Sequence, residues 1–184
     1  MNLSFEDTPL NGVKLIKPSF YEDNRGWLTE SYNDKTFAQN GIPCKVLQEK
    51  HSFSYKNVLR GMHFQKDPHA QGKLVRCSYG NIFDVVVDIR RNSASFGKWF
   101  GTELSSENKH QLYVPPGFAH GFVVMSDEAY FSYLITHSHF NKEHDAGINF
   151  NDAAIGIQWP VKTEHMIISD KDMNFPLLDS LDGI

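Results

Sequence analysis

The sequence predicts an all-β protein built as a sandwich or a barrel. Short apolar and β-branched runs alternate with turn signals along most of the 184 residues, a pattern typical of such folds. Phe is abundant, with 14 copies, and hydrophobic residues reach 40%, so the chain can form a sizeable β-rich core. It contains no repeat or low-complexity segment, and its length favours one domain over residues 1–184.

The predicted elements follow in chain order. Residues 12–16 form a short strand, 23–26 a turn and 27–32 a second strand. Asn33 or Asp34 is expected to cap a short helix that runs through Phe37 and ends near residues 40–41. Further strands are expected at 45–54, 57–65, 73–79, 82–89, 99–104, 111–114, 121–125 and 129–137. Residues 80–81 predict a tight hairpin turn, and a short helix is expected near Asp152 in the irregular stretch after Phe140.

Charge and cysteine usage exclude several classes of partner. The net charge of −4 gives no global attraction to nucleic acid or to an anionic membrane, so we expect neither as a partner. No apolar run reaches the roughly 18 residues of a transmembrane helix. The acidic start of the sequence lacks the signal-peptide pattern, which favours a cytoplasmic location. Cys44 and Cys77 lack metal-ligand spacing and would stay reduced there.

Residues 58–75 hold the most versatile set of functional groups. Arg60 can hold a phosphate with two hydrogen bonds, and His63 can take up and release a proton near neutral pH. Lys73 can stabilise a developing oxyanion. The alternative is an ordinary strand whose polar residues face water, and these residue types alone leave both interpretations open.

Strand periodicity assigns two of the polar residues to the interior. Tyr133 shares a face with Phe131 and Ile135, and Lys73 shares one with Val75. Both polar side chains are therefore expected to point into the barrel beside apolar neighbours. For Tyr133, a core tyrosine with a satisfied hydroxyl is the alternative.

Arg60 and His63 have opposite parity in a regular strand. If both serve one cavity, the strand must deviate between them, and Gly61 is the residue at which a bulge or bend is expected.

Residues 115–122 resemble the second half of the cupin signature, Pro-x-Gly-x-x-His, with His120 as its histidine. Metal-binding cupins pair it with His-x-His, but here that place reads His63-Phe64-Gln65 and lacks one imidazole. A transition-metal site needs three or four suitable donors, and no replacement carboxylate has the right spacing. We therefore expect a cupin or jelly-roll barrel with short peripheral helices and no metal.

A charged cluster at residues 168–172 is the last candidate for a functional site along the chain. It is either a solvated surface turn or a segment that folds back over the barrel mouth, with one aspartate orienting a histidine. Arg25, Glu30 and Gln48 also have a plain interpretation as exposed strand-edge residues.

Taken together, these stretches resemble the dTDP-4-dehydrorhamnose 3,5-epimerase family. Beside Glu30, the resemblance rests on residues 23–26, 48–54, 59–65, 71–75, 83–90, 95–97, 104–105, 116–122, 157–160 and 169–172. The motifs occur in order along nearly the whole chain, so their combination is specific although each alone is weak.

The resemblance implies four catalytic roles. His63 is similar to the family's general base, with Asp172 as its partner, and Tyr133 to the opposing general acid. Lys73 would lie at the C4 oxygen of a dTDP-linked 4-keto-6-deoxy sugar. No cofactor is implied.

The resemblance also implies a binding set. Ligand contacts would come from Arg60, His120, Gln48 and Lys171. Arg25 and Glu30 would act on the nucleotide of a neighbouring subunit, because the family forms homodimers by exchanging N-terminal strands.

Two positions depart from the family pattern. Lys50 stands where Asn is usual, and we expect it either to pair with Glu30 or Glu49 or to reach the diphosphate; the alternative is a lysine that extends to solvent at the rim. Relative to the family pattern, the stretch 136–144 carries a one-residue insertion, so Phe140 is our choice for stacking on the base, with His139 second.

The chemistry explains why these residue types belong together. In a 4-keto sugar, C3–H and C5–H both lie alpha to the carbonyl, so a base on one face and an acid on the other can invert each carbon through an enolate. We therefore expect a cofactor-independent 3,5-epimerase. The alternatives are a C3-only epimerase, an epimerase of another nucleotide sugar, a metal-dependent cupin enzyme and a non-enzymatic sugar-binding cupin.

Overall fold

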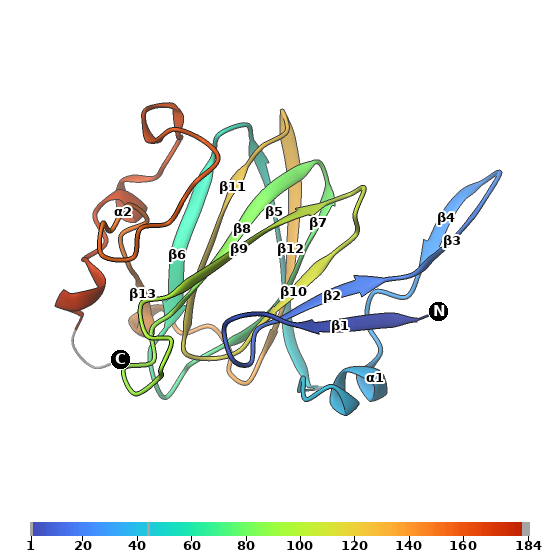
Figure 1. The fold of residues 1–184 in the computed structure, drawn as a ribbon, viewed down its shortest axis with the longest axis horizontal. Coiled ribbons are helices and arrows are strands. Elements are labelled where there is room, and N and C mark those ends of the chain that lie inside the picture. Colours follow the sequence, from blue (N-terminus) through green and yellow to red (C-terminus); the bar gives the residue numbers. More distant parts are fainter. Residues whose placement is uncertain (1, 44, 182–184) are drawn as a thin grey trace.

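A computed structural model describes residues 2–43 and 45–181 of the chain, so Cys44 lies outside the described residues. Two antiparallel sheets face each other across the core (Figure 1). The larger sheet has six strands, in the order β1 (Leu3–Asp7), β2 (Lys14–Pro18), β10 (Gln111–Val114), β7 (Gly72–Tyr79), β12 (Glu128–Thr136) and β5 (Val46–Tyr55).

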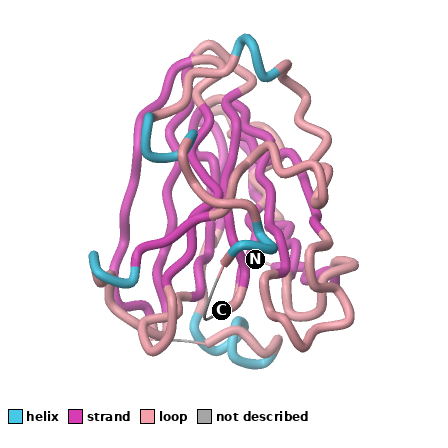
Figure 2. Tube along the Cα trace, turned by 90° about the vertical axis from the view of Figure 1, so that its left-hand side faces the viewer, coloured by secondary structure: helices cyan, strands magenta, loops and turns pink. Residues whose placement is uncertain are grey.

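The facing sheet has five strands, in the order β13 (Asp145–Gly147), β6 (Leu59–Gln65), β11 (Phe118–Val124), β8 (Asn81–Asp88) and β9 (Trp99–Ser105). A separate hairpin consists of β3 (Phe20–Asp23) and β4 (Gly26–Thr29). In Figure 2 strands fill the body of the molecule and helices lie only at its periphery. The expected all-β, cupin-like jelly-roll architecture is confirmed.

Side-chain alternation along β8 and β11 separates two apolar layers. Val86 and Phe122 point between the sheets, into a core that both sheets share. Val85 and Val123 point outward, where the C-terminal segment covers them with Ile148 and other apolar side chains. Because both faces of the five-stranded sheet are covered, its central strands are apolar on both sides.

The helices are short. They are α1 (Asp34–Gln39), α2 (Asp170–Met173) and the 3₁₀ turns η1 (Lys142–His144), η2 (Thr163–His165) and η3 (Leu178–Ser180). The expected N-cap is confirmed at Asn33, since its side-chain oxygen accepts a hydrogen bond from the Thr36 N–H at 3.1 Å. Phe37 of α1 is fully buried against the outer face of the six-stranded sheet, in a third apolar cluster with Ile16 and Leu74.

Two local predictions were wrong. No helix forms near Asp152, because this buried carboxylate accepts hydrogen bonds from the N–H groups of Ala154 and Leu178 and so fixes a turn. Gly80 and Asn81 do not form a hairpin, because β7 and β8 lie in opposite sheets. The chain crosses from one sheet to the other at Gly80, where φ is +78°.

Three strands were not predicted. β1 and β3 are short and largely exposed, and β13 has only three residues, so none of them contains the longer apolar run on which the strand predictions rest. Most predicted strands are confirmed within two residues, although β11 begins three residues earlier than expected and β4 ends at Thr29.

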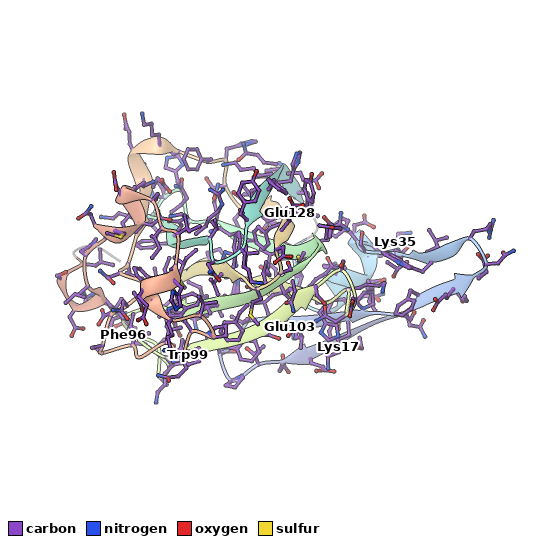
Figure 3. The ribbon with its side chains drawn as sticks, turned by 90° about the horizontal axis from the view of Figure 1, so that it is seen from above. Lys17, Lys35, Phe96, Trp99, Glu103 and Glu128 are labelled. Carbon is purple, nitrogen blue, oxygen red and sulfur yellow. The ribbon has the colours of Figure 1, made fainter. Side chains whose placement is uncertain are left out.

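The β3–β4 hairpin projects away from the barrel, as Figures 1 and 3 show; from above it extends beyond Lys17 and Lys35. Within the described residues, none of the helices has the length and apolarity needed to cross a membrane.

Candidate active site

A cavity of about 500 Å³ opens between the two sheets, and a smaller one of about 150 Å³ adjoins it. Four side chains line both: Lys50, His63, Lys73 and Tyr133. Arg60, His120 and Asp172 line the larger cavity. Phe140 and Asp145 line the smaller one. The structure therefore brings together most of the side chains that the sequence selected.

An irregularity in β6 places Arg60 and His63 in the same cavity. His63 pairs with His120 of β11, whereas Arg60 pairs with Phe122, so three steps on β6 oppose two on β11. The extra residue is Gly61, at φ +147°. A Cβ there would lie 2.6 Å from the Cα of Gly121 in the neighbouring strand, so only glycine fits. The deviation expected at Gly61 is confirmed.

His63 is held by a carboxylate from the far end of the chain. Its Nε2 lies 2.8 Å from Oδ1 of Asp172, and the other oxygen accepts the Gly61 N–H at 3.2 Å. Ser169 caps α2 by accepting the Asp172 N–H. Burial alone would raise the pKa of Asp172, but the hydrogen bonds from His63, Gly61 and Ser169 together lower it below its usual value. The cluster at 168–172 is thus a segment folded over the barrel mouth.

Tyr133 enters the cavity from the opposite sheet. It lies on β12, whereas His63 lies on β6, so the two titratable groups face one space from different sheets. Burial raises the pKa of the Tyr133 phenol; the nearby Arg60 charge works against this rise, and Asp145 adds to it. A phenol in this setting stays protonated at neutral pH and can donate a proton.

Lys73 is the most deeply placed cation of the site. Its Nζ donates to the carbonyl oxygen of His63 at 3.3 Å. Burial lowers the pKa of Lys73 to about 8, while the carboxylates of Asp145 and Asp84 oppose the fall and Lys50 adds to it. The ammonium form therefore still predominates at pH 7.

A second histidine–aspartate pair lies deeper than the first. His120 Nε2 lies 2.9 and 3.0 Å from the two oxygens of Asp84, and the carboxylate is completely buried. Burial raises the pKa of Asp84, although the His120 contact works against the rise. No role was assigned to Asp84 from sequence. Its signal was available: it is an acidic residue in an apolar strand, at the parity of the inward-facing Val86.

Phe140 is the residue of loop 137–144 that lines the smaller cavity. Gln48 is absent from the cavity lining; instead its side-chain oxygen accepts the Phe140 N–H at 2.9 Å. Lys50 does point inward, with its Nζ 4.1 Å from the centre of the Phe140 ring. Among the described residues it makes no ion pair with Glu30 or Glu49. His139 lies outside both cavities, in a separate surface hollow.

Lys171 forms an ion pair with Asp145, and Gln65 donates to the same carboxylate at 3.2 Å. Sequence reasoning missed Asp145, because the three-residue strand that carries it has no periodicity. The ion pair joins α2 to β13 at the edge of the cavity.

Arg25 and Glu30 do not reach the cavity of their own chain. Arg25 lies at the tip of the projecting hairpin, with its side chain 85% exposed and paired with Asp23 (Figure 1). Glu30 is half-buried just after β4. Within the part of the chain that the structure describes, no group of three or more His, Cys, Asp or Glu residues is placed to hold a metal ion.

The fold and the site together define a sugar-nucleotide epimerase on a jelly-roll barrel, and the comparisons with known proteins agree. The dTDP-4-dehydrorhamnose 3,5-epimerase family model matches residues 7–180, and the chain belongs to this family. It is 49% identical to the dTDP-4-dehydrorhamnose 3,5-epimerase of Escherichia coli K12, over 95% of this chain and 94% of that protein.

Solved structures of related epimerases are also similar to this chain in their three-dimensional fold. The epimerase of Legionella pneumophila in complex with dTDP-4-keto-L-rhamnose matches with a TM-score of 0.94 and 40% identity, over 98% of this chain and 95% of that one. A 3′-monoepimerase of Streptomyces bikiniensis in complex with dTDP-quinovose is more distant, with a TM-score of 0.87 and 31% identity over 94% and 87% of the two chains.

Proposed function

We propose that this protein inverts C3 and C5 of a dTDP-4-keto-6-deoxyhexose, in rhamnose-type deoxysugar biosynthesis. The observation that carries the proposal is the single cavity that His63, supported by Asp172, shares with Tyr133 of the facing sheet. A base on one side and an acid on the other are what inversion through a planar enolate requires.

The proton transfers can be assigned to atoms. Asp172 is ionised at neutral pH and accepts a hydrogen bond from Nε2–H of His63, which leaves Nδ1 as the basic nitrogen. Nδ1 would remove the proton from C3 or C5, and the Tyr133 hydroxyl would return one to the opposite face. His63 then releases its proton to solvent and Tyr133 takes one up from solvent. The sugar presents its other alpha carbon, and the cycle repeats.

Lys73 would stabilise the negative charge that develops on the C4 oxygen. Its ammonium is already buried beside His63, so it need not be desolvated during the reaction. One such preorganised donor typically contributes about 3 kcal/mol to transition-state stabilisation. Arg60 at the cavity wall, with Lys171, would hold the diphosphate.

Double inversion is favoured over inversion at C3 alone. Curated 3,5-epimerases are 35–49% identical to this chain over most of its length, most of them at 43% or more, whereas 3′-monoepimerase structures are 28–31% identical. The test is proton NMR of dTDP-4-keto-6-deoxyglucose with the protein in D₂O. We expect deuterium at both C3 and C5. Exchange at C3 alone would show a monoepimerase, and exchange at neither carbon would reject the function.

A homodimer is part of the proposal. The β3–β4 hairpin exposes Phe20, Tyr21, Trp27 and Leu28, each at least 43% accessible, although an isolated two-stranded hairpin is marginally stable in water. A second copy of the chain would cover this apolar hairpin and receive Arg25 at its cavity.

Complementation tests whether the sites are shared. We expect His63→Ala and Arg25→Ala each to lose most activity alone. Co-expressed at equal levels, they should recover about a quarter of wild-type activity, since half the dimers are mixed and each mixed dimer has one intact site. No recovery in demonstrably mixed dimers, or a fully active monomer by light scattering, would reject the shared site.

A cytoplasmic location also belongs to the proposal. It is supported by Cys77, a buried free thiol that suits a reducing compartment.

A further inference from the structure

Three polar side chains cross the inner face of the six-stranded sheet side by side. β12 lies between β5 and β7, and Tyr133 of β12 pairs directly with Lys50 of β5. Two residues further along β12, Ile135 pairs with Lys73 of β7. Two lysines therefore flank the phenol from neighbouring strands, and both line the same two cavities.

The three aspartates of this region are bound to other groups, and Glu49, which also lines the larger cavity, is exposed and makes no ion pair with Lys50 in the described part of the chain. Asp172 is bound to His63, Asp84 to His120, and Asp145 to Lys171 and Gln65. The contact found for Lys50 is the face of the Phe140 ring, at 4.1 Å. A cation–π contact leaves the full positive charge of Lys50 acting on its surroundings, whereas an ion pair would largely cancel it.

Lys73 is the group on which that charge acts most directly. Its own ammonium is buried and donates to a neutral carbonyl oxygen, that of His63. Two like charges in one water-poor cavity repel each other more strongly than they would in bulk water. We propose that Lys50 is a positioning residue that acts through Lys73: its positive charge disfavours the ammonium form of Lys73 and so moves the alkaline limit of the reaction to lower pH. This inference rests on the proposed function.

The direction in which Lys50 shifts the pKa of Lys73 follows from the charged groups that act on Lys73. Burial lowers the pKa of Lys73 to about 8; the positive Lys50 lowers it further, and the negative Asp145 and Asp84 raise it. The reaction needs the ammonium form, so activity should fall as the pH rises through the pKa of Lys73. The Tyr133 phenol should lose its proton only at higher pH, because burial raises its pKa above 10.0. Lys73 therefore governs the alkaline limb.

The experiment compares pH profiles of kcat/KM for wild type, Lys50→Gln and Lys50→Arg on dTDP-4-keto-6-deoxyglucose. Lys50→Gln removes the charge, so we expect its alkaline limb to move upward by roughly half a pH unit or more. Lys50→Arg keeps the charge and should retain the wild-type limb. Lys56→Gln is the matched control: this exposed lysine follows β5 and pairs with Asp127, far from the cavity, and should change nothing.

A second measurement does not depend on turnover. In protein labelled with ¹³C at lysine Cε, the Lys73 signal is the one lost in Lys73→Met, and its titration midpoint should rise in Lys50→Gln. An unchanged midpoint with an unchanged limb would overturn the inference. So would a higher KM with no shift of the limb, because Lys50 would then be only a ligand contact. If wild type exchanges neither C3 nor C5 proton, the proposed function fails instead, whatever the midpoint does.

Discussion

The two histidine–aspartate pairs of this cavity have the same composition and opposite electrostatics. The His63 side chain is 34% exposed and that of Asp172 7%, whereas His120 and Asp84 are 6% and 0% exposed. Several hydrogen bonds outweigh burial at Asp172 and lower its pKa. At Asp84 burial outweighs the single histidine partner and raises the pKa.

The difference shows that a residue pair does not define its own chemistry. The accessible pair can exchange protons with a ligand, because its histidine is the more exposed of the two that line the cavity and its carboxylate stays ionised as a fixed counter-charge. The buried pair joins two neighbouring central strands, β8 and β11, and there its first effect is on structure.

Replacing each histidine in turn should distinguish the roles of the two pairs most clearly. We expect His63→Ala to reduce turnover and deuterium exchange at both carbons by about a thousandfold or more, because the base itself is lost. His120→Ala should lower kcat/KM while leaving measurable exchange. Equal loss in both variants, with native circular dichroism, would mean that both pairs transfer protons.

Asp172→Asn should reduce kcat by roughly a hundredfold, less than the loss of His63, because a base remains but its tautomer and charge are no longer supported. Asp170→Asn is the matched control, since Asp170 is exposed at the start of the same helix. A silent Asp172→Asn beside a damaging Asp170→Asn would show that the wrong aspartate has been assigned.

Gly61→Ala tests the bulge that only the accessible pair uses. An added Cβ would meet the Gly121 backbone at 2.6 Å, and φ is +147°, so we expect a loss of about 2 kcal/mol or more in unfolding free energy. Gly26→Ala, where a Cβ meets nothing within 4 Å but φ is also positive, separates the clash from backbone strain. Equal losses by denaturant titration would contradict the clash.

The smallest effect is the pH dependence of stability. Asp172 has a lowered folded-state pKa, so its contribution is present above its ordinary pKa and is lost as the pH falls through the folded-state value. Asp84 has a raised folded-state pKa, so its contribution to stability is present at lower pH and is lost as the pH rises through the folded-state pKa. As the pH falls from about 4 to about 3, the wild-type stability advantage over Asp172→Asn should shrink. As the pH falls from about 6 to about 4, the wild-type advantage over Asp84→Asn should grow. Parallel slopes in urea titrations would contradict the contrast.

The sequence by itself determined the strand content, the helix cap at residues 33–34 and the inward direction of Tyr133 and Lys73. These features depend on local periodicity and side-chain chemistry, which a single strand or helix end already contains. The irregularity at Gly61 was predictable for the same reason, since Arg60 and His63 cannot share a face of a regular strand.

Tertiary structure decided what depends on distant partners. Asp84 and Asp145 acquire partners only when β11 and α2 pack beside them, and short β13 exists only as an addition to the edge of β6. The hairpin expected at Gly80 became a crossing between sheets because pairing depends on which strand offers a free edge, not on the turn alone. Burial raises the pKa of both Asp172 and Asp84, but only Asp172 has enough hydrogen bonds to outweigh it. Both effects depend on the whole fold around a carboxylate and not on its neighbours in the chain.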